Sequence, residues 1–135
     1  MKIFYDTGLA AFLLGITNEA QLEDHPLRGT LFENMVVNDF MKYGANNCRD
    51  EMLFFYRDKT QREVDMLRQL PNGSIEVYDI MSAQTVQSDF YANLNYLRPL
   101  LSDRLTCTLL IYDGDQENRQ PENGVVNFRR MFADV

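Results

Sequence analysis

The stretch REVDMLRQLPNGSIEVYDI, residues 62–80, contains two short apolar-rich runs on either side of a turn sequence. Apolar and polar side chains alternate in both runs. Alternation with a period of two residues indicates strands, because successive side chains of a strand point to opposite faces. We therefore expect a β-hairpin whose strands lie at 62–68 and 74–80.

Each predicted strand carries an acid, Asp65 in the first and Glu76 in the second. If the apolar residues of both strands share one face, the two acids share the other. A two-residue turn at Asn72-Gly73 would place Asp65 opposite Ile80, whereas a four-residue loop would place it directly opposite Glu76. Pro71 has no N–H for a ladder and favours the longer loop. Opposed carboxylates repel, so they require a divalent cation, an Arg or Lys, or a raised pKa, unless both simply face water.

A third acid lies on a predicted helix. Glu33 falls in the apolar sector of that helix, between Val37 and Phe40, and away from Asn34 and Asn38. A charged carboxylate there is destabilising unless it is paired. We therefore expect an arginine, backbone N–H groups or a metal ion beside Glu33.

The rest of the chain supplies helices and further strands. Residues 2–16 predict an extended segment followed by an apolar helix, with Asp6 or Thr7 as its N-cap and Gly15 as its end. Residues 17–27 are polar and predict a loop. The other expected elements are a helix at 28–43 that ends at Gly44, strands at 51–57 and 105–114, an amphipathic helix at 86–101, and a final edge strand within 124–132. This order predicts an α/β or α+β sheet with helices packed on it.

Composition bounds the class of protein. A chain of 135 residues, 45% hydrophobic and 24% charged, suits one domain with a real core. No apolar run is long enough to cross a bilayer and no signal peptide opens the chain, so we expect a cytoplasmic protein without a membrane partner. The net charge of −7 disfavours non-specific nucleic-acid binding. We interpret the basic cluster of Arg57, Lys59, Arg62 and Arg68 as solvated charges at a strand edge.

Several chemistries have no motif in the chain. It contains neither a P-loop nor a G-x-G-x-x-G fingerprint, so we expect no nucleotide cofactor on a familiar phosphate cradle. His25 is the only histidine, and nothing around it indicates a zinc site or a catalytic triad. Cys48 and Cys107 lie far apart in the sequence, and we expect two reduced structural cysteines.

Four blocks of the sequence, in this order and spacing, resemble a known family. The blocks are KIFYDTGLAAFLLGI (2–16), RGTLFENMVVNDF (28–40), LFFYRDKTQREVDML (53–67) and IEVYDIMSAQT (75–85). They are similar to an uncharacterised, DUF4143-type domain at the C-terminal end of many bacterial and archaeal AAA-type ATPases. The resemblance implies a restriction-endonuclease-like, or PD-(D/E)XK, α/β fold with a central mixed sheet of four to five strands flanked by helices. It also implies a single nuclease-like domain over 1–135 that forms the C-terminal part of a larger ATPase.

The resemblance puts Glu33, Asp65 and Glu76 at the acidic positions of the nuclease-like site, with Asp65 and Glu76 as Mg²⁺ ligands if that site is active. The nuclease pattern ends Glu-x-Lys, but this chain has Tyr78 at the lysine position. A lysine there would orient the attacking water and add positive charge, which a tyrosine does not supply at neutral pH.

Two functions follow from this departure. The favoured one is a non-catalytic, degenerate accessory or interaction domain that serves an ATPase module or another protein and holds no cofactor. The alternative is a Mg²⁺-dependent nuclease in which Lys42, Lys59 or Arg62 replaces the lysine. An interaction role makes exposed aromatic residues candidate contacts, although we expect most of the set Phe54, Phe55, Tyr56, Tyr91 and Tyr96 to lie in the core.

Overall fold

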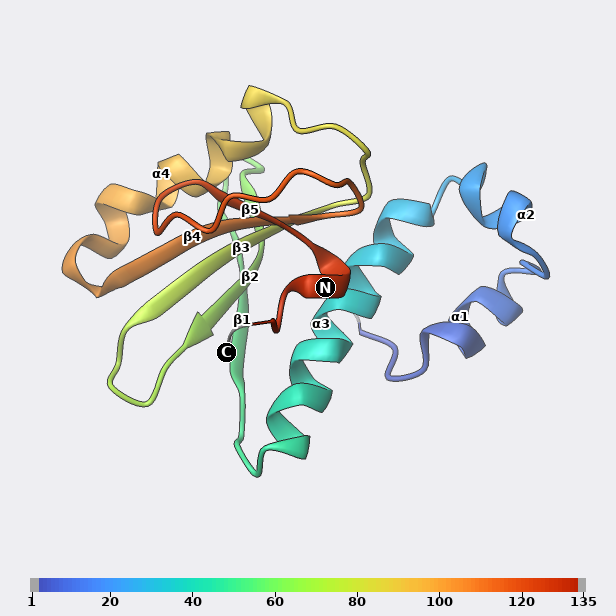
Figure 1. Cartoon of the computed structure of the whole chain (residues 1–135), viewed down its shortest axis with the longest axis horizontal. Coiled ribbons are helices and arrows are strands. Elements are labelled where there is room, and N and C mark those ends of the chain that lie inside the picture. Colours follow the sequence, from blue (N-terminus) through green and yellow to red (C-terminus); the bar gives the residue numbers. More distant parts are fainter. Residues whose placement is uncertain (1–2, 134–135) are drawn as a thin grey trace. The chain divides into compact units, whose positions relative to one another are not determined.

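The structure is a computed structural model that describes residues 3–133. It contains two compact units, of which the first ends at Asp50 and the second begins at Glu51. Helices make up the N-terminal unit, and a five-stranded sheet with a covering helix makes up the C-terminal unit (Figure 1). No helix among the described residues is long and apolar enough to span a membrane.

The N-terminal unit contains the helices α1 (Thr7–Leu13), α2 (Glu19–Glu23) and α3 (Arg28–Asn46). The Asp6 side chain caps α1 by accepting from the Leu9 N–H at 2.8 Å, as predicted. The sequence predicts a loop at 17–27, but the structure has helix α2 within this segment. Its N-cap, Asn18, accepts from the Gln21 N–H at 3.0 Å, and its residues form no apolar stripe that periodicity could reveal.

Helix α3 continues past Gly44, the predicted end, because another residue adopts the left-handed conformation. Cys48 has a φ of 53°, and the Arg49 N–H turns back to donate to the Gly44 carbonyl at 2.9 Å. Gly44 itself is buried inside the helix. Cys48 and Cys107 are both free thiols, but Cys48 is exposed and therefore plays no part in a core.

Buried amides fasten the start of the chain to α3. Asn34 accepts from the Phe4 N–H at 2.7 Å and donates to the Phe4 carbonyl at 2.9 Å, and Asn38 donates to the same carbonyl. Both asparagines are buried, with exposed fractions of 7% and 2%. The sequence placed them on the polar side of α3, and they do lie away from Glu33. That side is covered nonetheless, and the two amides bind the backbone N–H and carbonyl of Phe4 there.

The C-terminal unit is built on one mixed sheet. Its strands are β1 (Met52–Arg57), β2 (Glu63–Gln69), β3 (Ile75–Met81), β4 (Leu105–Tyr112) and β5 (Gly124–Asn127). They lie in the order β1-β2-β3-β4-β5. The first three are antiparallel, whereas β4 is parallel to β3 and β5 is parallel to β4. The predicted α/β class, mixed sheet and edge strand are confirmed.

Helix α4 (Ala92–Leu101) makes the crossover between the parallel strands β3 and β4 and covers one face of the sheet (Figure 1). Leu94 and Leu97 of the predicted apolar stripe are almost completely buried against Val64, Ile75 and Val77. Burial of each such side chain contributes about 1.5–3 kcal/mol. This helix and its cluster are therefore the main core of the unit.

The turn between β2 and β3 has three residues, Pro71 to Gly73. The Leu70 N–H donates to the Ser74 carbonyl at 2.9 Å, and the Gly73 N–H donates to the Leu70 carbonyl at 2.8 Å. Gly73 has a φ of 84°, which a left-handed residue at the end of a three-residue hairpin loop requires. Neither the two-residue turn nor the four-residue loop considered from the sequence forms, and the strand register changes accordingly.

Substitution of Gly73 tests this turn. Gly73→Ala is expected to lower the free energy of unfolding by about 1–2 kcal/mol, because a Cβ disfavours the left-handed conformation. Gly29→Ala is the control. A Cβ at Gly29 in α3 meets no atom within 4 Å, so alanine there should be neutral or stabilising. Urea unfolding followed by circular dichroism measures both, and an equal effect of the two variants would contradict the turn assignment.

Candidate functional site

The register of the hairpin places Arg68, not Asp65, opposite Glu76. In the same ladder Met66 lies opposite Tyr78. The expectation that Asp65 lies opposite Glu76 or Ile80 is therefore wrong. The three-residue loop sets a register that lies between the registers of the two-residue turn and the four-residue loop. A register change of one residue moves a side chain to the opposite face of the sheet.

Arg68 joins two acids across three strands. Its Nε and Nη2 atoms donate to the two carboxylate oxygens of Glu51, at 2.7 and 2.9 Å, in a bidentate pair. Its Nη1 atom lies 3.3 Å from Oε2 of Glu76, and the Tyr78 hydroxyl donates to the same oxygen at 2.6 Å. The side chains of Arg68 and Glu51 are only 12% and 6% exposed. The Glu76 carboxylate thus has a cation and a hydroxyl donor from its own hairpin.

Electrostatics keep Tyr78 and Arg68 in one protonation state near neutral pH. Burial, the Glu76 charge and the hydrogen bond to Glu76 together raise the pKa of Tyr78 well above its usual range, so its hydroxyl stays a donor. Burial alone would lower the pKa of Arg68, but the Glu51 carboxylate outweighs it and the pKa is raised. The cluster is therefore an ion-pair network with a neutral tyrosine.

Asp65 lies at a bulge and meets a different acid. Phe54 pairs with Leu67 and Tyr56 pairs with Val64, so two residues of β2, Asp65 and Met66, face one residue of β1. The Asp65 carboxylate accepts from the Ile80 N–H at 2.8 Å. Burial raises the pKa of Asp65. Hydrogen bonds from the Ile80 backbone and the buried Asp79 side chain act in the opposite direction but do not cancel this rise. A raised pKa was one of the expected remedies for carboxylate repulsion, but the neighbouring acid is Asp79.

The third predicted acid belongs to the other unit. Glu33 is half-buried on α3, whereas Asp65 and Glu76 lie in the C-terminal unit. No group of three or more His, Cys, Asp or Glu side chains within residues 3–133 is arranged to hold a metal ion. A shared site of Glu33, Asp65 and Glu76, with Mg²⁺ at the last two, stays a prediction.

Arg68 is the site residue that sequence reasoning missed. It was interpreted as a solvated edge charge, yet its side chain is largely buried. Of the cations considered as replacements, Lys42 lies 3.8 Å from Asp39 and the Arg62 guanidinium lies 4.4 Å from the centre of the Tyr96 ring. If Gly73 is taken as the left-handed residue of a three-residue loop, the resulting register places Arg68 opposite Glu76. That signal in the sequence could have identified Arg68.

The aromatic set divides into two groups. Tyr56, Tyr91 and Tyr96 are partly buried and pack against the core beneath α4. Phe54 and Phe55 on the edge strand β1 are 52% and 55% exposed, so the expectation that most of the set packs against the core is confirmed by the three tyrosines. Phe54 and Phe55 are consecutive on β1, so their side chains point to opposite faces of the sheet. One of them is therefore exposed whichever face the core covers.

Removal of the arginine tests the network. Arg68→Met leaves Glu51 and Glu76 without their cation and is expected to lower the free energy of unfolding by about 3–5 kcal/mol. Arg57→Met is the matched control. Arg57 pairs with Glu63 at 3.0 Å, but both side chains are 54% exposed, so the loss should stay below about 1 kcal/mol. Equal losses in chemical denaturation would show that the buried network does not stabilise the sheet.

The raised pKa of Asp65 predicts a pH dependence. A carboxyl with a pKa above its unfolded value of 3.8 favours folding most at low pH, and this contribution is lost as pH rises through the folded pKa. Asp65→Asn still accepts the Ile80 N–H but cannot ionise. We expect its stability relative to the wild type to increase between pH 3 and pH 7. Thermal midpoints measured across this range check the sign, and a parallel pH profile for both proteins would contradict it.

Comparison with known proteins identifies the family. Neither a curated protein nor a solved structure matches the chain. A family model described as "Domain of unknown function (DUF4143)" matches residues 28–131, from the start of α3 to just beyond the last 3-10 helix, η3 (Phe128–Arg130). The match covers most of the chain, including both acidic strands of the hairpin. The chain therefore belongs to the DUF4143 family.

Proposed function

We propose that this chain is a non-catalytic, degenerate nuclease-like domain with an accessory or interaction role in an AAA-type ATP-binding protein. The observation that carries the proposal is the state of Glu76. This acid stands at the position of the glutamate in the Glu-x-Lys pattern, and its carboxylate already accepts from Arg68 and Tyr78. Internal donors thus occupy an oxygen that a nuclease would offer to a metal ion.

Magnesium chemistry disfavours catalysis at such a carboxylate. Mg²⁺ requires near-octahedral oxygen ligands at about 2.0–2.1 Å and gives up its water reluctantly. To bind Oε2 of Glu76, it would have to displace the Tyr78 hydroxyl and a guanidinium that Glu51 also holds through two hydrogen bonds. Tyr78 stays neutral at physiological pH and adds no charge to stabilise a phosphorane-like transition state.

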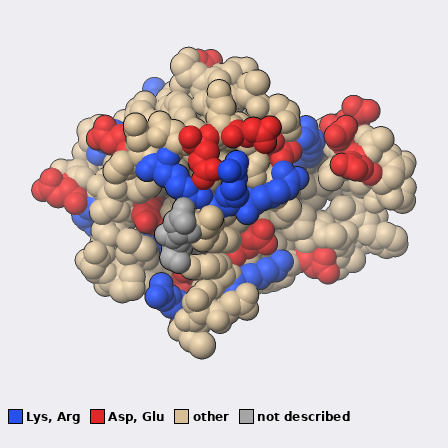
Figure 2. Space-filling view, viewed as in Figure 1, with Lys and Arg blue, Asp and Glu red and all other residues tan. Residues whose placement is uncertain are grey.

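The charged surface also favours an interaction role over nucleic-acid binding. Arg98 lies 2.6 Å from Glu122, and both Arg119 and Arg130 lie within 3 Å of Glu117. Figure 2 shows basic and acidic side chains next to one another on the visible face. Arginines paired in this way release few counterions from a phosphate backbone, so they contribute little to binding DNA or RNA.

The sheet topology supports the nuclease-like part of the proposal. Three antiparallel strands are followed by a helix and a parallel strand in one mixed sheet of five strands, in keeping with the central mixed sheet of four to five strands that the resemblance implies. Asp65 and Glu76 lie on neighbouring strands of that sheet. We propose that the fold is restriction-endonuclease-like and that the acids are remnants of its site.

A Mg²⁺-dependent nuclease is the alternative function. One observation favours it, namely that Arg68 places a cation 3.3 Å from Glu76 and so supplies the positive charge that Tyr78 lacks. In this alternative Asp65 and Glu76 would hold the metal, and Glu33 would join them from α3.

Metal titration and nuclease assays separate the two functions. With up to about 10 mM Mg²⁺ or Mn²⁺ we expect no rise in the thermal midpoint, whereas a site filled at 100 times its Kd would add about 2.7 kcal/mol. We also expect no cleavage of single- or double-stranded DNA or RNA. Cleavage that disappears in Asp65→Asn and Glu76→Gln would overturn the proposal in favour of the nuclease.

The link to an ATPase has a separate test. A Walker A motif in the same open reading frame, upstream of this domain, would support the association. A reading frame without a nucleotide-binding module, together with no co-purifying ATPase, would leave an interaction domain of another kind of protein.

A further inference from the structure

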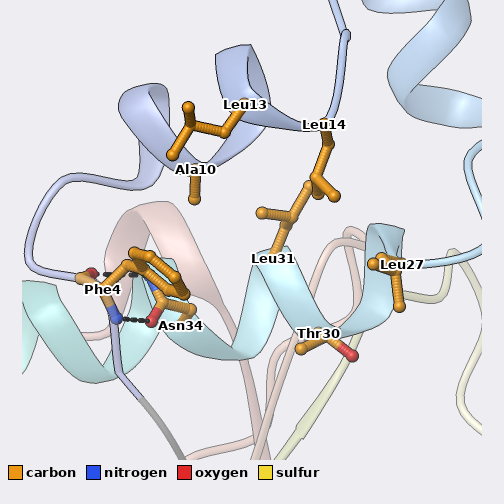
Figure 3. Close-up of a pocket in the computed structure, with 8 residues that line it drawn as sticks. All are labelled: Phe4, Ala10, Leu13, Leu14, Leu27, Thr30, Leu31 and Asn34. Carbon is orange, nitrogen blue, oxygen red and sulfur yellow. Dashed lines mark hydrogen bonds between the residues drawn. The ribbon is translucent and has the colours of Figure 1, made fainter.

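A cavity in the N-terminal unit lies between α1 and α3. It has a volume of about 410 Å³, within the range of about 300–1,000 Å³ typical of binding pockets. In Figure 3, Ala10, Leu13 and Leu14 form one wall, Leu27 and Leu31 form the facing wall, and the Phe4 ring lies at one end. Thr30 and Asn34 complete the lining. We call this cavity and its rim the α1–α3 groove.

The rim of the α1–α3 groove is unusually apolar for an exposed surface. Four of the apolar residues that line the groove are substantially exposed: Phe4, Leu13, Leu14 and Leu27. Leu13 reaches an exposed fraction of 66%. Apolar side chains gathered around a cavity mark a site that another molecule covers.

Hydrogen bonds hold the groove open in a defined shape. The Asn34 amide binds both backbone groups of Phe4 (Figure 3). It also donates to the Thr7 hydroxyl at 3.0 Å. Asp6 caps the first turn of α1. The start of the chain and α1 are thus fixed to α3 through buried amides. A preformed groove binds at a lower entropic cost than one that must be ordered by its ligand.

Charge around the groove specifies the partner. Residues 3–27 contain four acids, Asp6, Glu19, Glu23 and Asp24, and the one lysine or arginine in the segment 3–34 that lines the groove is Arg28. All four acids are exposed, and Figure 2 shows acidic side chains gathered over α2. The complement of this surface is an apolar stripe flanked by Lys and Arg. Nucleic acids and anionic membranes carry the opposite charge to that complement and are disfavoured.

The walls favour a helix over an extended peptide. Both walls come from helices, whose backbone groups are already bonded within each helix, so the groove offers no strand edge to an extended chain. A helix satisfies its own backbone and needs only an apolar face. We propose that the α1–α3 groove binds a basic amphipathic helix of a partner protein. This inference rests on the proposed interaction role and names the chemistry of the partner.

Two designed helical peptides of about 20 residues test the proposal. Both carry the same leucine stripe, and one is flanked by Lys and the other by Glu. Fluorescence anisotropy with the full chain should show binding of the Lys peptide at least about tenfold tighter than of the Glu peptide, with an affinity that falls as salt rises. Equal affinities for the two peptides, or no binding of the Lys peptide, would overturn the proposal.

Matched variants locate the contact. Leu13→Gln removes an exposed apolar side chain of the groove and should weaken binding of the Lys peptide about tenfold. Leu100→Gln is the control, because Leu100 is 60% exposed on α4, outside the groove, and its substitution should leave binding unchanged. Equal weakening by both variants would mean that the peptide binds elsewhere.

Other occupants give different results. A dimer in sedimentation experiments that Leu13→Gln converts to a monomer would assign the groove to a second copy of the chain and overturn the proposal. If the chain binds lipid vesicles and Leu13→Gln abolishes this binding, the groove is assigned to a membrane and the proposal is overturned. Nucleic-acid cleavage in the metal experiments would overturn the proposed function and leave the peptide result standing, whereas absent peptide binding without cleavage would overturn the groove alone.

Discussion

The C-terminal unit depends on the guanidinium of Arg68 being held between two carboxylates. Glu51 stands just before β1, Arg68 lies on β2 and Glu76 lies on β3, so one side chain ties three neighbouring strands together. A largely buried ion pair adds little net stability over an apolar contact, because desolvation offsets the Coulomb attraction. The pair also favours one register, since a shift of one residue between β2 and β3 would move Arg68 and Glu76 to opposite faces and leave the Glu76 carboxylate without its arginine.

The same interaction accounts for how the Glu76 carboxylate is held on a strand that carries Tyr78, and not a lysine, two residues later. A carboxylate on a half-buried strand needs a positive partner or a proton. The nuclease pattern supplies a lysine and a metal ion, whereas this hairpin supplies Arg68 and the Tyr78 hydroxyl to Glu76. For Asp65 the remedy is a proton, because burial next to Asp79 raises its pKa. Each acid thus has a local remedy that needs no metal, which is the physical basis of the accessory role proposed for the domain.

The two units contribute differently to that role. The sheet unit is closed around α4 and its leucines, and its arginines are largely consumed in ion pairs. The N-terminal unit exposes apolar side chains around a cavity and carries acidic charge without bases in its first 25 described residues, 3–27. The proposed accessory role requires contact with a partner, and the helical unit exposes the apolar surface for that contact.

Sequence by itself determined the strands, the crossover helix α4 and its apolar stripe, the α/β class, the hairpin and the acids on it, since periodicity and turn residues depend only on neighbours along the chain. It could not identify α2, which has no stripe, or the burial of Asn34 and Asn38, whose partner is Phe4, about 30 residues away. Only the tertiary structure decided which side chains meet. The three-residue loop and the bulge at Asp65 each alter the pairing by an odd number of residues, and one residue is enough to exchange the faces of a strand. The three-residue loop, in place of the four-residue loop considered from the sequence, moves the β2–β3 pairing by three residues, so Arg68, and not Asp65, stands opposite Glu76.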